Sequence, residues 1–125
     1  MPSSDTLQKF IARVEQNAHV EAIQEFYTED ASMQENQTPA RVGRDVLVAH
    51  ESRAMSKAKS VQSRCVHPIL INGDVVVIRW KFRFEWLDNT ISEIEELTYQ
   101  QWRGERIAQE QFFYDPATFK PKDIQ

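Results

Sequence analysis

The chain has 125 residues, of which 41% are hydrophobic and 27% are charged, and its formal net charge is −4. Residues 1–125 therefore fit one domain that can bury its own core. The composition excludes a disordered or low-complexity chain. The acidic balance argues against a nucleic acid partner, which usually selects a basic face. The single Cys65 excludes an intrachain disulfide, and the polar amino terminus and short apolar runs indicate neither a signal peptide nor a membrane span, so we expect a cytoplasmic protein.

The first half of the chain predicts three helices. Between Leu7 and Val14, apolar side chains recur every three or four residues, which is typical of one buried helix face. Asp5 is the expected N-cap of this helix. A second, short helix should begin at about residue 19, with Tyr27 turned inward, and the third should cover residues 44–57.

The second half of the chain predicts an antiparallel sheet. Residues 31–36 fit a short strand, and four long strand-like runs follow the third helix. Asn72-Gly73 separates two of these runs and is a strong signal for a tight type I′ hairpin. Helices followed by a strand meander predict an α+β fold, in which the helices cover one face of the sheet. The four runs are 60–71, 75–87, 91–103 and 106–115.

Strict alternation assigns the two faces of the run from Val75 to Trp86. Every even-numbered residue of this run is apolar, whereas the odd-numbered residues are mostly charged. Because successive side chains of a strand point to opposite faces, the even set should face the helices and the odd set should face solvent or a partner.

The loop after this run sets which residues of the next strand lie opposite it. A three-residue loop at 88–90 pairs Phe82 with Glu96 and, on the outer face, Arg83 with Glu95, which is a favourable charge pair. Polar groups that face the interior are costly unless they are hydrogen-bonded or hydrated, so this register favours a sheet that curves around a wet cavity. The polar residues that it turns inward are Glu96, Thr98 and Gln100.

The last run, around WRGERIAQEQFFYDP, leaves two alternatives open. A two-residue turn at 104–105 pairs Trp102 with Ile107, both facing inward. A regular strand beyond Ile107 would then turn Gln109 and Gln111 inward. A single bulge after Ile107 would turn the other set inward, which is Glu110, Phe112 and Tyr114.

We favour the bulge for this last run. It buries two aromatic side chains and gives Glu96 a phenolic hydrogen-bond donor in Tyr114. Bulges are also common beside active sites, where they re-aim side chains. Phe113 would then lie on the outer face of the sheet, where a second copy of the chain would cover it.

Three stretches of the sequence resemble the SnoaL-like branch of the NTF2-like superfamily. They are FYTEDASMQEN, GRDVLVAHE and ELTYQQWRGERIAQEQFFYDP, and the resemblance covers nearly the whole chain. It implies a cone with a cavity between three helices and a curved antiparallel sheet, and a homodimer formed through the outer sheet face. Members of the superfamily include ketosteroid isomerases, polyketide cyclases, epoxide hydrolases and dehydratases that act on small, largely apolar molecules, and other members have no known reaction.

The catalytic sets of the known enzymes are incomplete in this sequence. The resemblance places the epoxide hydrolase Asp-Arg-Asp set on Ile78, Trp80 and Phe112, none of which can activate water. No isomerase or cyclase set is complete either. The ionisable or amide residues expected inside the cone are Glu35, His50, Glu96, Gln100 and Glu110.

A carboxyl between Trp80 and Phe82 would have its pKa raised by burial, which suits a general acid or base. We therefore predict that the catalytic residues are Glu96, Glu110 and His50. Each has an ordinary alternative, since a buried carboxyl can be purely structural and His50 can simply bond a carbonyl. The predicted ligand-binding residues are Glu35, Trp80, Phe82, Gln100, Phe112 and Tyr114.

Two functions fit these observations. In the first, the protein binds a small, partly apolar molecule in the cone and performs acid–base chemistry on it without a metal or an organic cofactor, as an isomerase, cyclase or lyase would. In the second, it is a non-catalytic ligand-binding or association module. The three histidines and the cysteine show no metal-ligand spacing.

Overall fold

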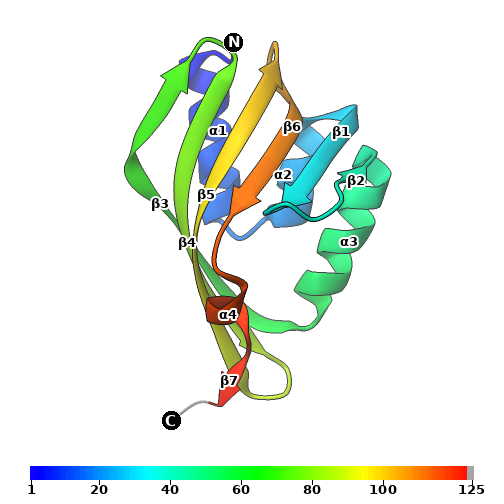
Figure 1. Ribbon diagram of the computed structural model, residues 1–125, viewed down its shortest axis with the longest axis vertical. Coiled ribbons are helices and arrows are strands. Elements are labelled where there is room, and N and C mark those ends of the chain that lie inside the picture. Colours follow the sequence, from blue (N-terminus) through cyan, green and yellow to red (C-terminus); the bar gives the residue numbers. More distant parts are fainter. Residues whose placement is uncertain (124–125) are drawn as a thin grey trace.

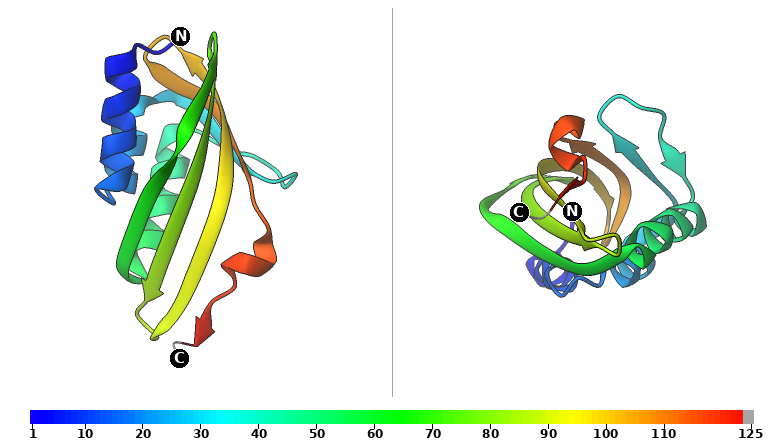
Figure 2. Two further views of the ribbon diagram at one scale, coloured as in Figure 1. Left: turned by 90° about the vertical axis from the view of Figure 1, so that its left-hand side faces the viewer. Right: turned by 90° about the horizontal axis from the view of Figure 1, so that it is seen from below.

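The computed structural model describes residues 1–123 and has the predicted α+β architecture. Helices α1 (Ser4–Glu15), α2 (His19–Phe26) and α3 (Arg44–Ser56) pack on one face of a curved sheet (Figures 1 and 2). A fourth, short helix, α4 (Pro116–Phe119), follows the last long strand and was not predicted. Within residues 1–123, no helix has the length and apolarity needed to cross a membrane.

The sheet contains the predicted meander together with a parallel pair that was not predicted. The strands are β1 (Tyr27–Glu35), β2 (Arg41–Val42), β3 (Ala58–Asn72), β4 (Val75–Trp86), β5 (Thr90–Arg103), β6 (Arg106–Phe113) and β7 (Lys122–Asp123). Their order in the sheet is β2-β1-β6-β5-β4-β3, with β7 paired to β5. The meander β3 to β6 is antiparallel, whereas β1 runs parallel to β6, so the sheet is mixed.

The register between β4 and β5 differs from the predicted one by two residues. Trp80, not Phe82, lies opposite Glu96. The connecting loop occupies residues 87–89 because Asn89 adopts a left-handed conformation (φ 66°) that closes a three-residue loop one position earlier than predicted. A shift of two residues preserves the faces, so the predicted inward residues of both strands do face inward.

The same shift changes the ion pairs on the outer face. The predicted pair between Arg83 and Glu95 is wrong. Glu95 instead pairs with Arg79, and Arg83 lies 3.8 Å from Glu93.

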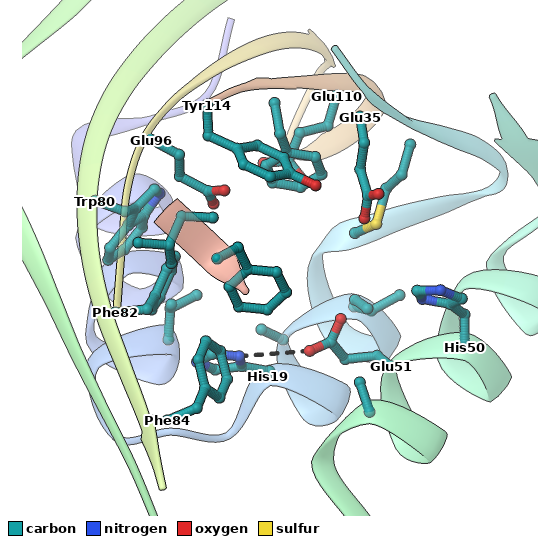
Figure 3. Close-up of a pocket in the computed structure, with 18 of the residues that line it drawn as sticks. His19, Glu35, His50, Glu51, Trp80, Phe82, Phe84, Glu96, Glu110 and Tyr114 are labelled. Carbon is teal, nitrogen blue, oxygen red and sulfur yellow. Dashed lines mark ion pairs between the residues drawn. The ribbon is translucent and has the colours of Figure 1, made fainter. Parts of the chain in front are cut away.

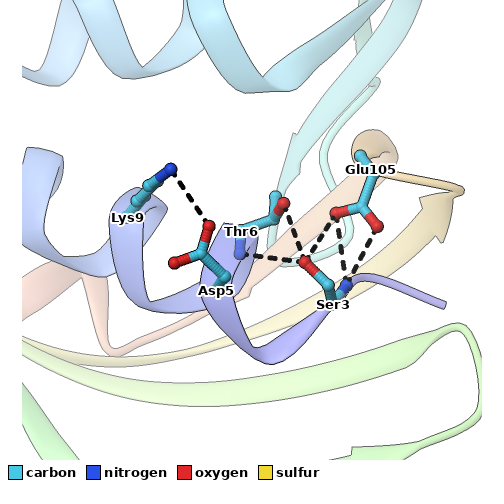
Figure 4. A network of polar contacts seen from close by, with 5 residues as sticks. All are labelled: Ser3, Asp5, Thr6, Lys9 and Glu105. Carbon is cyan, nitrogen blue, oxygen red and sulfur yellow. Dashed lines mark hydrogen bonds and ion pairs between the residues drawn. The ribbon is translucent and has the colours of Figure 1, made fainter.

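The N-cap of α1 is Ser3 and not Asp5. The Ser3 hydroxyl accepts a hydrogen bond from the backbone amide of Thr6 at 3.1 Å, while Asp5 lies inside the first turn and pairs with Lys9. The amide and hydroxyl of Ser3 also donate to the carboxylate of Glu105 in the turn between β5 and β6 (Figure 4). The start of the first helix is thereby attached to the sheet.

Tyr27 begins β1 instead of ending the second helix. Its amide still closes α2 by donating to the carbonyl of Ile23, but its own backbone is extended (φ −110°, ψ 150°). Tyr27 is 3% exposed and pairs with Ile107 of the parallel neighbour β6. The inward orientation of Tyr27 is as predicted, and its hydroxyl reaches Glu110 of the neighbouring strand.

The predicted bulge in β6 is present. Trp102 pairs with Ile107 and Gln101 pairs with Gln109, so Ala108 is an extra residue. This insertion turns Glu110 inward opposite Gln100 and Phe112 inward opposite Thr98, as predicted. Phe113 is on the outer face, also as predicted, with 39% of its surface exposed.

Candidate functional site

A pocket of about 200 Å³ lies between the helices and the inner sheet face (Figure 3). Drug-sized ligands usually occupy pockets of about 300–1,000 Å³, so this volume favours a smaller molecule. Most of its wall is aromatic or aliphatic. Of the predicted site residues, those that line it are Glu35, His50, Trp80, Phe82, Glu96, Glu110, Phe112 and Tyr114.

Glu96 is a buried carboxyl of the predicted site that lines the pocket. It is 9% exposed, it lies on β5 opposite Trp80, and its carboxyl points into the pocket (Figure 3). No hydrogen bond or ion pair joins that carboxyl to another side chain among residues 1–123. The predicted phenolic donor, Tyr114, does not pair with it, because β6 ends at Phe113 and releases Tyr114 from the ladder.

Glu110 is held by hydrogen bonds on both carboxyl oxygens. The Tyr27 hydroxyl donates to Oε1, and Nε2 of Gln100 donates to Oε2 at 2.6 Å. Nε1 of Trp102 in turn donates to Oε1 of Gln100 at 3.0 Å, which fixes the orientation of that amide. Glu110 is therefore positioned by residues from β1 and β5, although it belongs to β6.

Burial raises the pKa of both carboxyls towards neutral pH. The pKa of Glu96 rises from 4.5 to about 8, first because burial disfavours the charged form and then because of the negative charges of Glu110, Glu35 and Glu51. The pKa of Glu110 rises from 4.5 to about 7; burial is again the main cause, and the hydrogen bonds from Gln100 and Tyr27 oppose it. Near neutral pH both carboxyls are therefore at least partly protonated.

Gln100 does not contact the pocket. It is fully buried behind Glu110, so the prediction that it binds the ligand is replaced by a positioning role. Tyr114 does line the pocket. Burial, and after it the negative charge of Glu35, raises the pKa of the Tyr114 hydroxyl to about 12.

His50 and Glu35 lie at the margin of the pocket. Both are half-buried, and the Glu35 carboxylate lies 3.6 Å from the guanidinium of Arg41 on β2. Figure 3 shows the imidazole of His50 at the edge of the group, separated from Glu96 and Glu110 by the width of the pocket. The structure therefore brings Glu96 and Glu110 together but does not bring His50 to them.

Sequence reasoning missed a second polar group at the opposite side of the pocket. His19 on α2 lies 2.8 Å from the hydroxyl of Ser63 through Nε2, and 3.5 Å from the carboxylate of Glu51 on α3 through Nδ1. His19 and Glu51 line the pocket, but Ser63 does not, and its hydroxyl donates to Asn17. Helical spacing was the available signal, since His19 is four residues before the buried Ile23.

The remaining sequence expectations concern metals. Among residues 1–123, no group of three or more His, Cys, Asp or Glu side chains is arranged to hold a metal ion. Cys65 is buried, and burial raises the pKa of its thiol.

The family of the chain follows from its sequence. The model of the SnoaL-like domain family matches residues 7–111. The chain belongs to the SnoaL-like family. This branch lies within the NTF2-like superfamily, whose cone of helices on a curved sheet is the fold described above. No protein of curated function matches this SnoaL-like chain by sequence.

Solved structures share the fold of this SnoaL-like protein at low sequence identity. A protein with a ketosteroid isomerase-like fold from Catenulispora acidiphila, in complex with trimethylamine, has a TM-score of 0.77 and 16% identity over 94% of this chain and 90% of its own. An NTF2-like protein of unknown function from Burkholderia pseudomallei has a TM-score of 0.75 and 9% identity over 90% of each chain. These similarities establish the fold and leave the reaction open.

An epoxide hydrolase also shares the fold. The LEH-like epoxide hydrolase of Mycobacterium tuberculosis has a TM-score of 0.74 and 11% identity over 92% of this chain and 84% of its own. In the SnoaL-like protein, the positions that the family resemblance assigned to water activation carry Ile78, Trp80 and Phe112. These side chains are apolar or aromatic, so the epoxide hydrolase set is absent from this chain.

Proposed function

We propose that this SnoaL-like protein binds a small, partly apolar molecule in the pocket and transfers protons to or from it without a metal or an organic cofactor, as an isomerase, cyclase or lyase would. The observation that supports the proposal is the carboxyl of Glu96. It is buried, it is unpaired among residues 1–123, and it faces a pocket with aromatic walls. A carboxyl in such surroundings has a pKa suited to acid–base chemistry at neutral pH.

The two carboxyls take different roles in this proposal. Glu96 carries a proton at neutral pH because its pKa is about 8, and it donates that proton to the ligand. Once ionised, it removes a proton from a neighbouring carbon. Glu110 holds a fixed position because both its oxygens accept hydrogen bonds, and its charge tunes the proton affinity of Glu96.

The walls of the pocket orient the ligand. Trp80 and Phe82 stack with ring centroids 5.6 Å apart beside Glu96. Phe112 and Tyr114 close the side formed by the end of β6, and His50 and Glu35 contact the polar end of a ligand at the margin. We propose the cytoplasm as the compartment, which is consistent with the single, unpaired Cys65.

The second candidate function is association without catalysis, and the outer sheet face favours it. Leu97, Tyr99 and Phe113 are 46%, 47% and 39% exposed, and Leu97 pairs directly with Phe113 across β5 and β6. Exposed apolar side chains gathered on one face often mark an interface. We propose that a second copy of the chain covers this face, whether or not the pocket is catalytic.

An uncharged proton-transfer probe tests the catalytic proposal. A carboxylate base opens nitrobenzisoxazole by removing its ring C–H proton while the N–O bond breaks, which gives a nitrile and a coloured phenolate. We expect turnover to rise as the pH passes about 8, the pKa of Glu96, and to fall by about a hundredfold in Glu96→Gln, the usual scale of general base catalysis.

A matched variant controls for charge. Glu93→Gln removes the same charge from the outer face of the same strand, where Glu93 is exposed, and it should leave turnover unchanged. If the wild-type protein binds unreactive nitroindole by calorimetry but opens nitrobenzisoxazole no faster than Glu96→Gln, the catalytic proposal is wrong and the binding module is correct.

A further inference from the structure

Acidic side chains outnumber basic ones in the lining of the pocket. Four carboxyls line it, and two of them have a basic neighbour. Glu35 lies 3.6 Å from Arg41, and Glu51 lies 3.5 Å from His19. No Lys, Arg or His side chain among residues 1–123 lies within 4 Å of the other two, Glu96 and Glu110, so these two carboxyls lack a cationic partner.

Glu96 is the clearer sign of a missing partner. Its side chain is 9% exposed and lies on the inner face of the sheet. Its carboxyl makes no hydrogen bond with the described residues and points into the pocket (Figure 3). Among residues 1–123, the one fully buried side-chain polar atom without a hydrogen bond is the Thr98 hydroxyl, so the oxygens of Glu96 are reached through the pocket. A ligand that enters the pocket therefore meets a carboxyl that no protein group satisfies.

The walls around this carboxyl suit an organic cation. Trp80 lies opposite Glu96 on the neighbouring strand, and its ring stacks on Phe82. Further along β4, Phe84 and Trp86 stack with centroids 5.0 Å apart, and Phe119 of α4 meets both rings edge to face. Aromatic rings attract cations over their faces and pack well against methyl or methylene groups.

We propose that the ligand of the pocket is a small organic ammonium ion, whose cationic head lies between Glu96 and the aromatic rings. This inference rests on the proposed role of the pocket as the ligand site and names the chemical class of the ligand. An inorganic cation fits less well, because it would need more oxygen ligands than these two carboxyls and rings provide.

Proton release follows from this arrangement. The ionisable groups that face Glu96 come from several elements: Glu110 on β6, Glu35 on β1, Arg41 on β2, Glu51 and His50 on α3, and His19 on α2. A bound cation favours the charged forms of Glu96 and Glu110, so it lowers their pKa values and expels protons. With such a ligand bound, Glu96 is ionised and takes the base step of the proposed proton transfer. Affinity for a permanent cation should therefore increase with pH.

Choline and dimethylbutanol, its uncharged isostere with carbon in place of nitrogen, test the proposal by calorimetry. At about pH 8.5 we expect choline to bind at least about tenfold more tightly than the isostere. Between about pH 6 and about pH 8.5 its Kd should fall by about tenfold or more, as the ionised fractions of Glu110 and Glu96 rise. Choline binding should release protons to the buffer.

Glu96→Gln should weaken choline binding by about tenfold while leaving the isostere unaffected. Glu93→Gln, which changes the outer face of the same strand, should alter neither affinity. The proposal is overturned if the wild-type protein binds the isostere as tightly as choline at alkaline pH, or if choline affinity does not change with pH. Both outcomes are measured on the unmodified protein, so they do not depend on the folding of a variant.

The nitrobenzisoxazole assay separates this inference from the proposed catalysis. Turnover that depends on Glu96, together with equal binding of choline and isostere, would refute the ammonium ligand and keep the enzyme. Selective choline binding without turnover would support the ammonium ligand and assign the protein to the binding modules.

Discussion

Replacing Glu96 by glutamine should stabilise the protein at alkaline pH and leave its stability nearly unchanged at acidic pH. In the folded protein the pKa of Glu96 is about 8, whereas the ordinary value is 4.5. The folded state therefore binds this proton more tightly than the unfolded state does. The stability that comes from the tighter binding is fully present below about pH 4.5 and is lost as the pH rises to about 8.

The magnitude follows from the size of the pKa difference. The two values differ by 8 − 4.5, which is about 3.5 units, and one unit corresponds to about 1.36 kcal/mol. The free energy of unfolding of the wild type should thus fall by up to about 5 kcal/mol between about pH 4 and about pH 9 from this residue alone. Water that enters the pocket to solvate the carboxylate makes this figure an upper limit. Glutamine keeps the shape of the side chain but has no ionisable group, so Glu96→Gln should not lose this unfolding free energy at alkaline pH.

Urea denaturation followed by tryptophan fluorescence measures the effect. Unfolding free energies of the wild type and Glu96→Gln are compared at about pH 5, 7 and 9, and the difference between the two proteins isolates Glu96 from all other titrating groups. Glu93→Gln serves as the exposed control and should show a difference that does not vary with pH. If the wild type and Glu96→Gln keep a constant difference from acid to alkali, the carboxyl is hydrated and the burial argument is wrong.

Two further predictions concern the neighbour of Glu96 and the outer face. Tyr27→Phe removes the hydroxyl that donates to Glu110. Because this hydrogen bond lowers the pKa of Glu110, that pKa should rise above about 7 in the variant. Infrared titration of the protonated carboxyl band, with Glu110→Gln as the reference, measures the pKa, and an unchanged value would contradict the prediction. Leu97→Glu places a charge in the exposed apolar patch of β5 and should convert a dimer to a monomer in sedimentation equilibrium, whereas Leu70→Glu, on a residue 60% exposed elsewhere in the sheet, should not. A wild type that sediments as a monomer would exclude the homodimer.

The inner face of the sheet was predictable because it depends only on alternation. Trp80 and Phe82 follow one another at a spacing of two, and a register error of two residues leaves Glu96 on the same face. The bulge in β6 was also predictable, because a regular strand would have buried amides in place of Phe112. Both inferences use constraints that act within one strand or between two adjacent ones.

The parts that sequence reasoning missed depend on contacts between distant segments. Tyr27 was assigned to a helix because it continues an apolar helical pattern, and only its parallel pairing with Ile107 makes it extended. His19 and Glu51 come from different helices, so no local pattern indicates that they are 3.5 Å apart. Propensity and periodicity do not specify how α2 and α3 approach each other.

The position of Glu110 shows how the fold makes the two carboxyls unequal. Without the extra residue Ala108, a regular β6 would turn Glu110 outward and leave the Tyr27 hydroxyl and the Gln100 amide without their shared acceptor in the interior. Each buried and unpaired donor costs about 1–3 kcal/mol, so the hydrogen bonds of Glu110 help to hold the bulge in place. Glu96 takes part in no comparable network among residues 1–123 and can change its protonation without breaking one. Glu110 therefore has its position determined by folding, which is why the proposed function assigns proton exchange with the ligand to Glu96.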